Sequence, residues 1–310
     1  MNKQSTDSII MVKPYHFGYN EQTATSNPYQ HTPSELHKNE KSVQTKAMQE
    51  FNDMVDKLSK NGIRVLILSK EPHSITPDSI FPNNWFSYHQ NNSLVIYPML
   101  AVNRRKERQP EALIQILEKE GFKKPQIIDL TKFEDNGMYL ESTGSMVLDR
   151  KNNVAFAMQS PRTSKDVFTT WCDAMQYEGV YIESTDHHAN EVYHTNLIMS
   201  LGTKFAVICS EVIEDKSERE FVLQKLRQLK RVIIEITLKQ AYQFCGNILE
   251  LKTANNKTII IMSETAKTAF TKIQIATLET YGKILTFSIP TIEKIGGGGV
   301  RCMVAEIFSN

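Results

Sequence analysis

The sequence has few cysteines, almost no net charge and no long hydrophobic run. Its four cysteines lie dozens of residues apart and form neither a CxxC pair nor a dense disulfide framework: Cys172, Cys209, Cys245 and Cys302. We therefore expect reduced thiols, as in a cytoplasmic protein. The formal net charge of +1 gives no long-range field that would collect nucleic acid or acidic membranes, which favours a small-molecule partner.

Membrane insertion and export are not expected either. Apolar runs such as residues 205–209 and 258–262 are far too short to cross a bilayer. The first residues, MNKQSTDSII, lack the basic start, long apolar stretch and cleavage site of a secretory signal. The composition, 40% hydrophobic and 23% charged over 310 residues, is ordinary for a globular protein. These features predict a cytoplasmic protein that binds no membrane.

One pattern recurs along the chain with a period of fifty-odd residues. Two alternating apolar strands flank a turn, an amphipathic helix follows, and a further strand ends the unit. We expect such units at residues 85–130, 145–184, 196–237 and 247–289. In the earliest of these four, the predicted helix covers residues 104–121.

The two ends of the chain complete the pattern. A strand at 8–14, a helix at 44–62 and a strand at 63–69 lack one strand, and the last strand, at 302–308, has no partner nearby. Pairing the first and last strands closes a ring and leaves no open edge. The sequence thus predicts an α/β fold with five ββαβ blades and pseudo-fivefold symmetry, formed by residues 1–310 as a single domain.

A short segment rich in glycine, asparagine or reactive side chains precedes the first strand of each unit. It contains Asn84, Glu141, His194, Asn247 and Cys302, at spacings of 57, 53, 53 and 55 residues. Because equivalent positions in a ring converge on its axis, we expect these five to meet at one end of it. The alternative is that they are turn residues, an interpretation that we favour for Asn247 alone.

Cys302 is the candidate nucleophile. It follows Gly296–Gly299, which would let a substrate approach the backbone and deliver the thiol to the start of a strand. A lone cysteine in a strand is more often buried packing. A thiolate needs an acid–base partner, however, and His194 occupies the equivalent position two blades earlier. Glu141, one blade before that, is placed to orient the imidazole.

These residues resemble a known superfamily. PDSIFPNNW with Asp78, LESTGS with Glu141, SPRT with Arg162, YHTN with His194 and GGGGVRC with Cys302 look like the ordered motifs of the guanidine-modifying (pentein) superfamily, which contains arginine deiminases, dimethylarginine dimethylaminohydrolases and amidinotransferases. The resemblance covers nearly the whole chain. The start PYHFGYNEQTATSNPYQ, with PNNWFS, NRRKER and GGGGVRCM, is most similar to the citrulline-utilization hydrolase (CtlX-type, amidinotransferase-like) branch.

Membership implies the five-bladed pentein propeller and covalent thiol catalysis without a metal or other cofactor. The resemblance carries the catalytic roles onto Cys302, His194 and Glu141. It also implies that Arg104 or Arg105, together with Arg162, binds the substrate α-carboxylate, a task that suits the planar guanidinium fork. Without the resemblance, NRRKER is more typical of a solvated helix start.

Two departures from the family pattern bear on the substrate. Relatives that act on a guanidinium usually have an acidic residue at Asn84, and deiminases have another at Asn196. An amide offers a donor and an acceptor, which suits a neutral ureido group and favours citrulline over arginine. Asp78 remains acidic, and relatives use it to hold substrate nitrogens, so a guanidino substrate stays open.

The predicted reaction is hydrolysis of a carbon–nitrogen bond. The Cys302 thiolate attacks the ureido carbon, His194 protonates a departing nitrogen, and water activated by the same imidazole hydrolyses the S-linked carbon. Citrulline would give ornithine, ammonia and carbon dioxide, whereas arginine would give citrulline and ammonia. The alternatives are an arginine deiminase or dimethylargininase, an amidinotransferase and, from another class, a binding protein with the same fold, like the ribosome anti-association factor.

Other site types are disfavoured. His187 and His188 lack the paired cysteines or helical spacing of a metal site. The glycines before Cys302 are not followed by Lys-Ser or Lys-Thr, so they do not form a phosphate-binding loop. The remaining cysteines are expected in the core. For partners, we predict a small amino-acid substrate, no nucleic acid and no membrane, and we leave a homodimer open.

Overall fold

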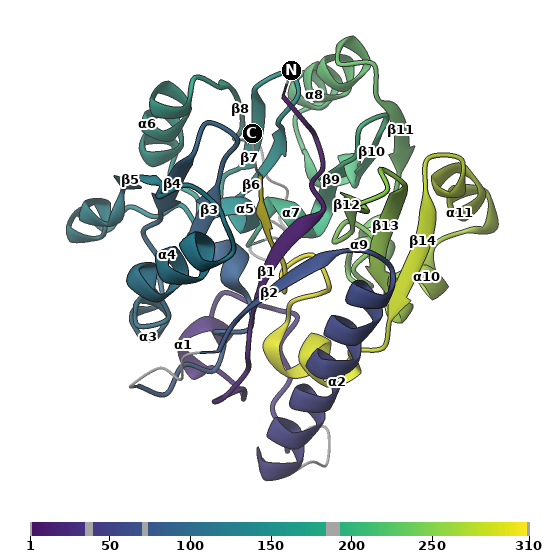
Figure 1. Cartoon of the computed structure of the whole chain (residues 1–310). Coiled ribbons are helices and arrows are strands. Elements are labelled where there is room, and N and C mark those ends of the chain that lie inside the picture. Colours follow the sequence, from purple (N-terminus) through teal and green to yellow (C-terminus); the bar gives the residue numbers. More distant parts are fainter. Residues whose placement is uncertain (1, 35–39, 70–73, 184–192, 309–310) are drawn as a thin grey trace.

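The computed structural model describes residues 2–34, 40–69, 74–183 and 193–308. Five sheets of three strands each are arranged in a ring, with the longer helices around its outside and the short helices α5 (Ser142–Ser145) and α7 (Thr195–Ile198) at its centre (Figure 1). Within each sheet one strand pair is antiparallel and the other is parallel. The predicted five-bladed α/β propeller is thereby confirmed.

Four blades are continuous in sequence. Their strands are β3 (Phe86–Tyr88), β4 (Ser93–Ile96) and β5 (Gln126–Asp129); β6 (Met146–Asp149), β7 (Val154–Met158) and β8 (Glu178–Ile182); β9 (Met199–Leu201), β10 (Phe205–Ile208) and β11 (Val232–Glu235); β12 (Leu249–Lys252), β13 (Thr258–Ser263) and β14 (Lys283–Phe287). Their outer helices are α4 (Pro110–Lys119), α6 (Lys165–Met175), α8 (Lys216–Gln228), and α10 (Glu264–Ala269) with α11 (Lys272–Glu279).

The fifth blade joins the two ends of the chain. β1 (Ser8–Val12) pairs antiparallel with β15 (Ala305–Ile307) and parallel with β2 (Arg64–Leu68), while α2 (Glu40–Lys60) packs against β2. This pairing confirms that the first and last strands share a blade, so the ring has no open strand at its joint.

Burial along the strands follows from their place in the ring. The middle strands β1, β7 and β10 are buried at every position, whereas the outer strands β2 and β11 combine buried, half-buried and exposed positions. A strand covered on both faces needs apolar residues throughout, and an outer strand needs them on one face only. Trp85 and Trp171 are completely buried.

The prediction of a single helix over residues 104–121 is wrong. The structure has two helices there, α3 (Val102–Arg105) and α4, because Pro110 lacks a backbone N–H and begins a new helix at its first position. Shorter elements complete the described parts of the chain: α1 (Glu21–Ala24), α5 (Ser142–Ser145), α7 (Thr195–Ile198), α9 (Leu238–Ala241), and the short helical segments Pro82–Asn84, Thr131–Asn136, Ser210–Val212 and Ile292–Gly296.

Candidate active site

Asn84, Glu141, His194, Asn247 and Cys302 each lie just before the first strand of their blade, and we call the place where they meet the hub. Asn84 ends a helical turn, while Glu141 and His194 are the N-cap residues of α5 and α7, two helices that pack against each other. All five side chains are at most 3% exposed. The ring therefore brings residues from five blades into one buried site.

Glu141 and His194 form a hydrogen-bonded pair. His194 Nε2 lies 2.8 Å from Glu141 Oε2. Burial works to raise the pKa of the Glu141 carboxyl, but the charge of Arg162 and the hydrogen bond to His194 hold that pKa well below its usual range. Burial lowers the pKa of His194 to about 4, against the opposing effect of Glu141. At neutral pH the site therefore holds a carboxylate beside a neutral imidazole.

Cys302 lies in a turn and not in a strand, contrary to the prediction. Its backbone N–H donates to the Gly299 carbonyl, and β15 begins three residues later. Asn247 Nδ2 lies 3.2 Å from the Cys302 sulfur and Asn196 Nδ2 lies 3.6 Å from it. Burial raises the thiol pKa, and the hydrogen bond from Asn247 is the largest opposing effect.

The contacts of Asn247 contradict our interpretation of this residue as a mere turn residue. Besides contacting the thiol, it accepts a hydrogen bond from the Arg301 N–H and donates one to the Asn196 carbonyl. Its position in the repeat could have identified it as a hub residue, since Asn247 precedes β12 as His194 precedes β9.

The glycines before Cys302 have a packing role that the sequence did not predict. A Cβ on Gly298 would lie 2.7 Å from a ring carbon of Phe81, and one on Gly299 would lie 2.6 Å from Asn247 Oδ1. Gly297 adopts a left-handed conformation with φ of +65°. These glycines therefore allow close packing against protein side chains.

Arg104 is buried among acidic groups. Its Nε and Nη2 each donate to Glu107 at 3.0 Å, and its Nη1 donates to Asn84 Oδ1 at 2.8 Å. Asp78 Oδ2 and Glu141 Oε2 are each 3.8 Å from its guanidinium. Burial raises the pKa of Glu107 to about 7, in spite of Arg104. Glu107 was not predicted, because NRRKER gives no sign of which side chains are buried.

The other two arginines differ in their surroundings. Arg162 is 2% exposed, lies 3.4 Å from Glu141 Oε2 and stacks over the Tyr193 ring. Arg105 donates to the Met99 carbonyl and lies 3.4 Å from Glu134 Oε2. The structure thus places Arg104 and Arg162 beside Glu141, while Arg105 contacts Met99, Leu100 and Glu134, which are not among the five hub residues.

Two of the buried oxygens that have no hydrogen-bond partner among the described residues belong to predicted site residues: Asp78 Oδ1 and Asn196 Oδ1. Burial raises the pKa of Asp78, although Arg104 opposes it. Since a buried acceptor without a partner is costly, both oxygens are suited to receive N–H groups of a ligand.

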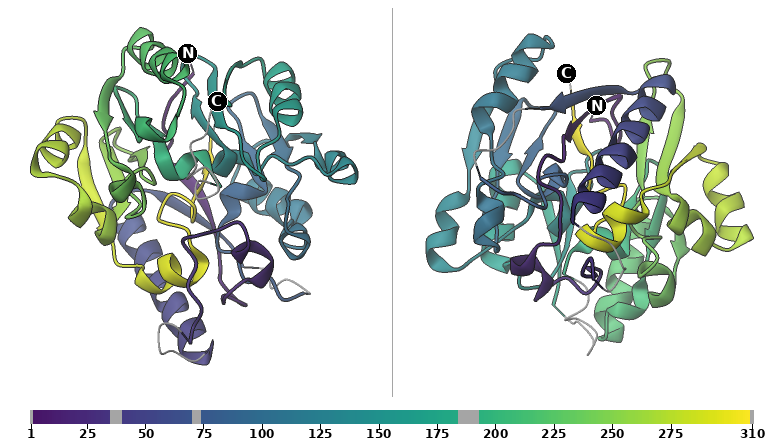
Figure 2. Two further views of the ribbon diagram at one scale, coloured as in Figure 1. Left: turned by 180° about the vertical axis from the view of Figure 1, so that it is seen from behind. Right: turned by 90° about the horizontal axis from the view of Figure 1, so that it is seen from below.

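The N-terminal segment with α1 covers this site, a contact that the sequence did not predict. Asn20 Nδ2 donates to Asp78 Oδ2 at 2.7 Å, and the Thr23 hydroxyl donates to the same oxygen at 3.1 Å. Arg162 donates to the Thr23 carbonyl and, at 2.9 Å, to the Ser26 hydroxyl. The view from behind shows α1 on the same side as the segment that precedes Cys302 (Figure 2, left).

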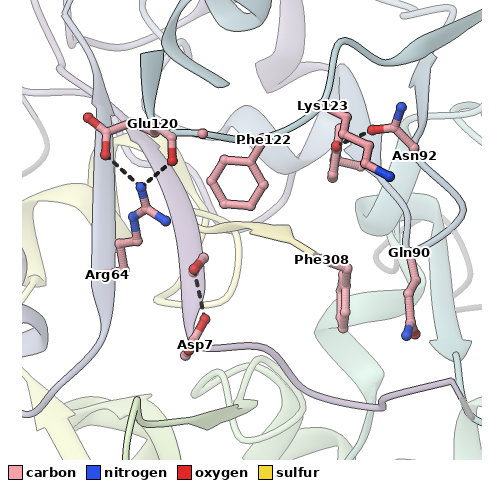
Figure 3. A pocket seen from close by; sticks show the side chains of 11 residues that line it. Asp7, Arg64, Gln90, Asn92, Glu120, Phe122, Lys123 and Phe308 are labelled. Carbon is pink, nitrogen blue, oxygen red and sulfur yellow. Dashed lines mark hydrogen bonds and ion pairs between the residues drawn. The ribbon is translucent and has the colours of Figure 1, made fainter. Parts of the chain in front are cut away.

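A separate surface cleft of about 380 Å³ does not include any hub residue. Phe122 and Phe308 lie on its walls, and Arg64 pairs with Glu120 at one end (Figure 3). In the described parts of the chain, no three His, Cys, Asp or Glu side chains are grouped to hold a metal, and no helix is long and apolar enough to cross a membrane. His187 and His188 lie outside the described residues.

Residues 13–309 match the family model described as N,N dimethylarginine dimethylhydrolase, eukaryotic. The N-terminal domain of ArgZ, an arginine dihydrolase from the ornithine–ammonia cycle in cyanobacteria, has a TM-score of 0.73 and 18% identity, over 97% of this chain and 98% of that domain. For full-length ArgZ the values are 0.74 and 18%, over 98% of this chain but only 41% of that one.

Two further solved structures are similar. DDAH from Pseudomonas aeruginosa, complexed with citrulline, has a TM-score of 0.65 and 15% identity, over 98% of this chain and all of that one. AgrE in complex with L-arginine has a TM-score of 0.74 and 16% identity, over 97% of this chain and 40% of that one. At these identities the likeness concerns the fold alone. No curated protein sequence matches the chain.

Proposed function

The chain belongs to the family described as N,N dimethylarginine dimethylhydrolase, eukaryotic, within the guanidino-modifying pentein superfamily, and from this we propose that it hydrolyses a carbon–nitrogen bond of citrulline through Cys302. The observation that carries the proposal is the hub itself. The Glu141–His194 pair and the Cys302 thiol are all buried, and Asn196, two residues after His194, lies 3.6 Å from the sulfur. Among the described residues, the oxygens Asp78 Oδ1 and Asn196 Oδ1 are buried acceptors without a partner.

Cys302 acts as the nucleophile in this proposal. His194, neutral at pH 7, takes the thiol proton as the sulfur bonds to the ureido carbon, giving a tetrahedral intermediate. The imidazolium returns the proton to a departing nitrogen, and Glu141 stabilises its positive charge across the 2.8 Å hydrogen bond.

A water molecule completes the reaction. His194 removes its proton as the oxygen attacks the S-linked carbon, the carbon–sulfur bond breaks, and the thiol is restored. The released carbamate decomposes to carbon dioxide and an amine. Citrulline and water thus give ornithine, ammonia and carbon dioxide, with no redox step and no cofactor.

We assign different residues to the two ends of the substrate, its α-carboxylate and its ureido group. Arg162 is the cation we propose for the substrate α-carboxylate, because apart from Glu141, 3.4 Å from its Nη1, its partners are the neutral Thr23 carbonyl and Ser26 hydroxyl of the covering segment. Asp78 Oδ1 and Asn196 Oδ1 accept N–H groups of the substrate. The amides Asn84 and Asn196 suit an uncharged ureido group.

Arginine is the second candidate substrate. ArgZ is an arginine dihydrolase and AgrE has been crystallised with L-arginine, which supports a guanidino substrate for a chain of the same fold. The carboxylate of Asp78 supports it too. In this case the same thiol chemistry would act on the guanidinium carbon.

Incubation with citrulline, arginine, methylated arginines and agmatine tests the proposal. We expect the fastest turnover with citrulline, scored as ornithine and ammonia, and its loss in Cys302→Ser. Cys172→Ala is the matched control, because that buried thiol lies in α6 outside the hub. Ammonia release from arginine that equals or exceeds that from citrulline would overturn the choice of substrate.

Two other classes are tested in the same assay. An amidinotransferase would transfer the group to an added acceptor amine, so products are compared with and without one. A binding protein with this fold would leave Cys302 unlabelled by iodoacetamide, with no protection by substrate. The cytoplasmic location that we propose agrees with four free thiols. Gel filtration would test the homodimer.

A further inference from the structure

The amide of Asn84 is held in one orientation. Its Oδ1 accepts a hydrogen bond of 2.8 Å from Arg104 Nη1, and its Nδ2 lies 3.2 Å from Asn83 Oδ1. A free asparagine side chain offers one donor and one acceptor group. Since the oxygen is already bound by a cation, the part of Asn84 left for a ligand is its N–H donor.

That donor faces the hub. A Cβ built on Gly144 would overlap Asn84 Nδ2 and lie 2.9 Å from both Cε1 and Nδ1 of His194. Asn84 Nδ2 and the imidazole therefore border the same point of α5. The amide nitrogen is thus on the side of the residues that we propose for catalysis.

Arg104 is in turn fixed by Glu107. The carboxylate receives Nε and Nη2 at 3.0 Å each, an arrangement that restricts the guanidinium plane, and both side chains are 2% exposed. Nη2 also points at the backbone carbonyls of Asp78 and Phe81, each 3.4 Å away. With Nη1 on Asn84, every nitrogen of this guanidinium is directed at a protein acceptor.

We propose that Glu107 and Arg104 are positioning residues that hold the Asn84 amide with its nitrogen toward the hub, and that this relay selects a ureido oxygen over a guanidinium nitrogen. The proposal rests on the proposed function and deepens it. It also reassigns Arg104, which the family resemblance gave as an anchor of the substrate carboxylate.

The hydrogen-bonding pattern of the hub fits this selection. Asn196 uses its nitrogen on the Cys302 sulfur, so its oxygen is left as an acceptor, and Asp78 Oδ1 is a second acceptor. One donor and two acceptors match a ureido group, which carries one oxygen and two nitrogens. A guanidinium has only donors, so one of its N–H groups would face the Asn84 donor without a partner. Such a mismatch disfavours it roughly tenfold to a hundredfold.

The experiment measures kcat/KM for citrulline and for arginine in the wild type, Asn84→Asp, Glu107→Gln and Glu107→Asp. Asn84→Asp replaces the donor by an acceptor and is expected to lower the citrulline-to-arginine ratio at least about tenfold. Glu107→Gln frees Arg104 and should lower the ratio in the same direction, while Glu107→Asp restores part of it. Glu111→Gln, at an exposed position of α4, is the control and should keep the wild-type ratio.

The citrulline-to-arginine ratio of kcat/KM distinguishes a positioning role from a general loss of stability, because a destabilised fold lowers the activity on both substrates alike. An unchanged ratio in Asn84→Asp and in Glu107→Gln, with wild-type preference for citrulline, would overturn the relay and leave the proposed function standing. Wild-type preference for arginine would instead overturn the choice of citrulline. If Glu107→Gln does not fold, Asn84→Asp alone decides, because a preserved citrulline preference in it contradicts the relay.

Discussion

Asn247 Nδ2 lies 3.2 Å from the Cys302 sulfur, while Oδ1 of the same side chain accepts the Arg301 N–H at 3.0 Å. One buried amide from the blade of β12 thus contacts both the thiol and the turn that carries it. A donor at this distance stabilises a thiolate more than a thiol, because a hydrogen bond to an ionised group is the stronger one.

Asn247→Ala is expected to make Cys302 less reactive. Loss of the donor should raise the thiol pKa further, since a hydrogen bond to a charged group contributes about 1.5–3 kcal/mol and stabilises the thiolate. The rate of iodoacetamide labelling at pH 8 should fall several-fold. Asn255→Ala, in an exposed turn of the same blade, is the control. Equal labelling of Asn247→Ala and wild type would contradict the role of this contact.

The labelling rate of the unliganded protein should keep rising through pH 9. The thiolate is the reactive form, and burial raises the Cys302 pKa above its ordinary value of 9.0. Rates measured from pH 6 to pH 10, with Cys302→Ser as background, test this. The thiols of Cys172 and Cys245, whose pKa burial raises to about 12, should contribute little. A plateau below pH 8 would indicate a thiolate already paired with protonated His194.

The stabilisation that depends on neutral His194 and His89 should be lost as the pH is lowered from 6.5 toward 4, while Glu107, whose pKa burial raises to about 7, changes the stability in the opposite direction over part of this range. Burial lowers the pKa of His194 to about 4, and burial with the nearby charge of Arg150 lowers that of His89 well below 6.5. The unfolded chain then binds protons that the folded one does not, so the stabilisation is complete above pH 6.5 and is lost below it. For His194 alone the loss is on the order of 3 kcal/mol.

Guanidinium unfolding midpoints at pH 7 and pH 4.5 measure this effect. His89→Gln, a change outside the hub, removes one of these imidazoles and should raise the midpoint at pH 4.5 relative to the midpoint at pH 7. If the difference between the two midpoints is the same in His89→Gln as in the wild type, His89 is not held neutral by burial.

Gly299→Ala should impair both stability and thiol reactivity. The added Cβ would lie 2.6 Å from Asn247 Oδ1 and 3.0 Å from a ring carbon of Phe244, so the amide that contacts Cys302 must shift. Overpacking of this kind costs about 1–3 kcal/mol. Gly18→Ala is the matched control, because its added Cβ would lie 3.9 Å from its nearest neighbour, the His16 carbonyl oxygen. Thermal unfolding and iodoacetamide labelling measure the two effects, and a Gly299→Ala protein that matches the Gly18→Ala control in both would refute this packing account.

Much of the hub was predictable because it repeats with the blades. Asn84, Glu141, His194 and Cys302 stand before equivalent strands, and alternation of apolar residues is a local property that reveals those strands. The same register marks Asn247. We nevertheless predicted a turn residue there, because an asparagine beside a glycine is also typical of a turn.

The two neighbouring arginines show where local pattern fails. Successive residues of a helix point about 100° apart, so only one of Arg104 and Arg105 can face the interior, and the choice depends on where α3 begins. The structure buries Arg104 against Glu107, whereas Arg105 lies beside Glu134. The sequence NRRKER alone does not contain this information.

The sequence by itself determined the five blades, the pairing of β1 with β15 and most of the side chains that reach the hub. Strand periodicity and repeat spacing can be recognised in the sequence without knowledge of the fold. Only the tertiary structure decided which atoms these side chains present. The free oxygen of Asn196, the inward nitrogen of Asn84 and the neutral His194 all result from contacts between different blades and from burial, which no single segment specifies.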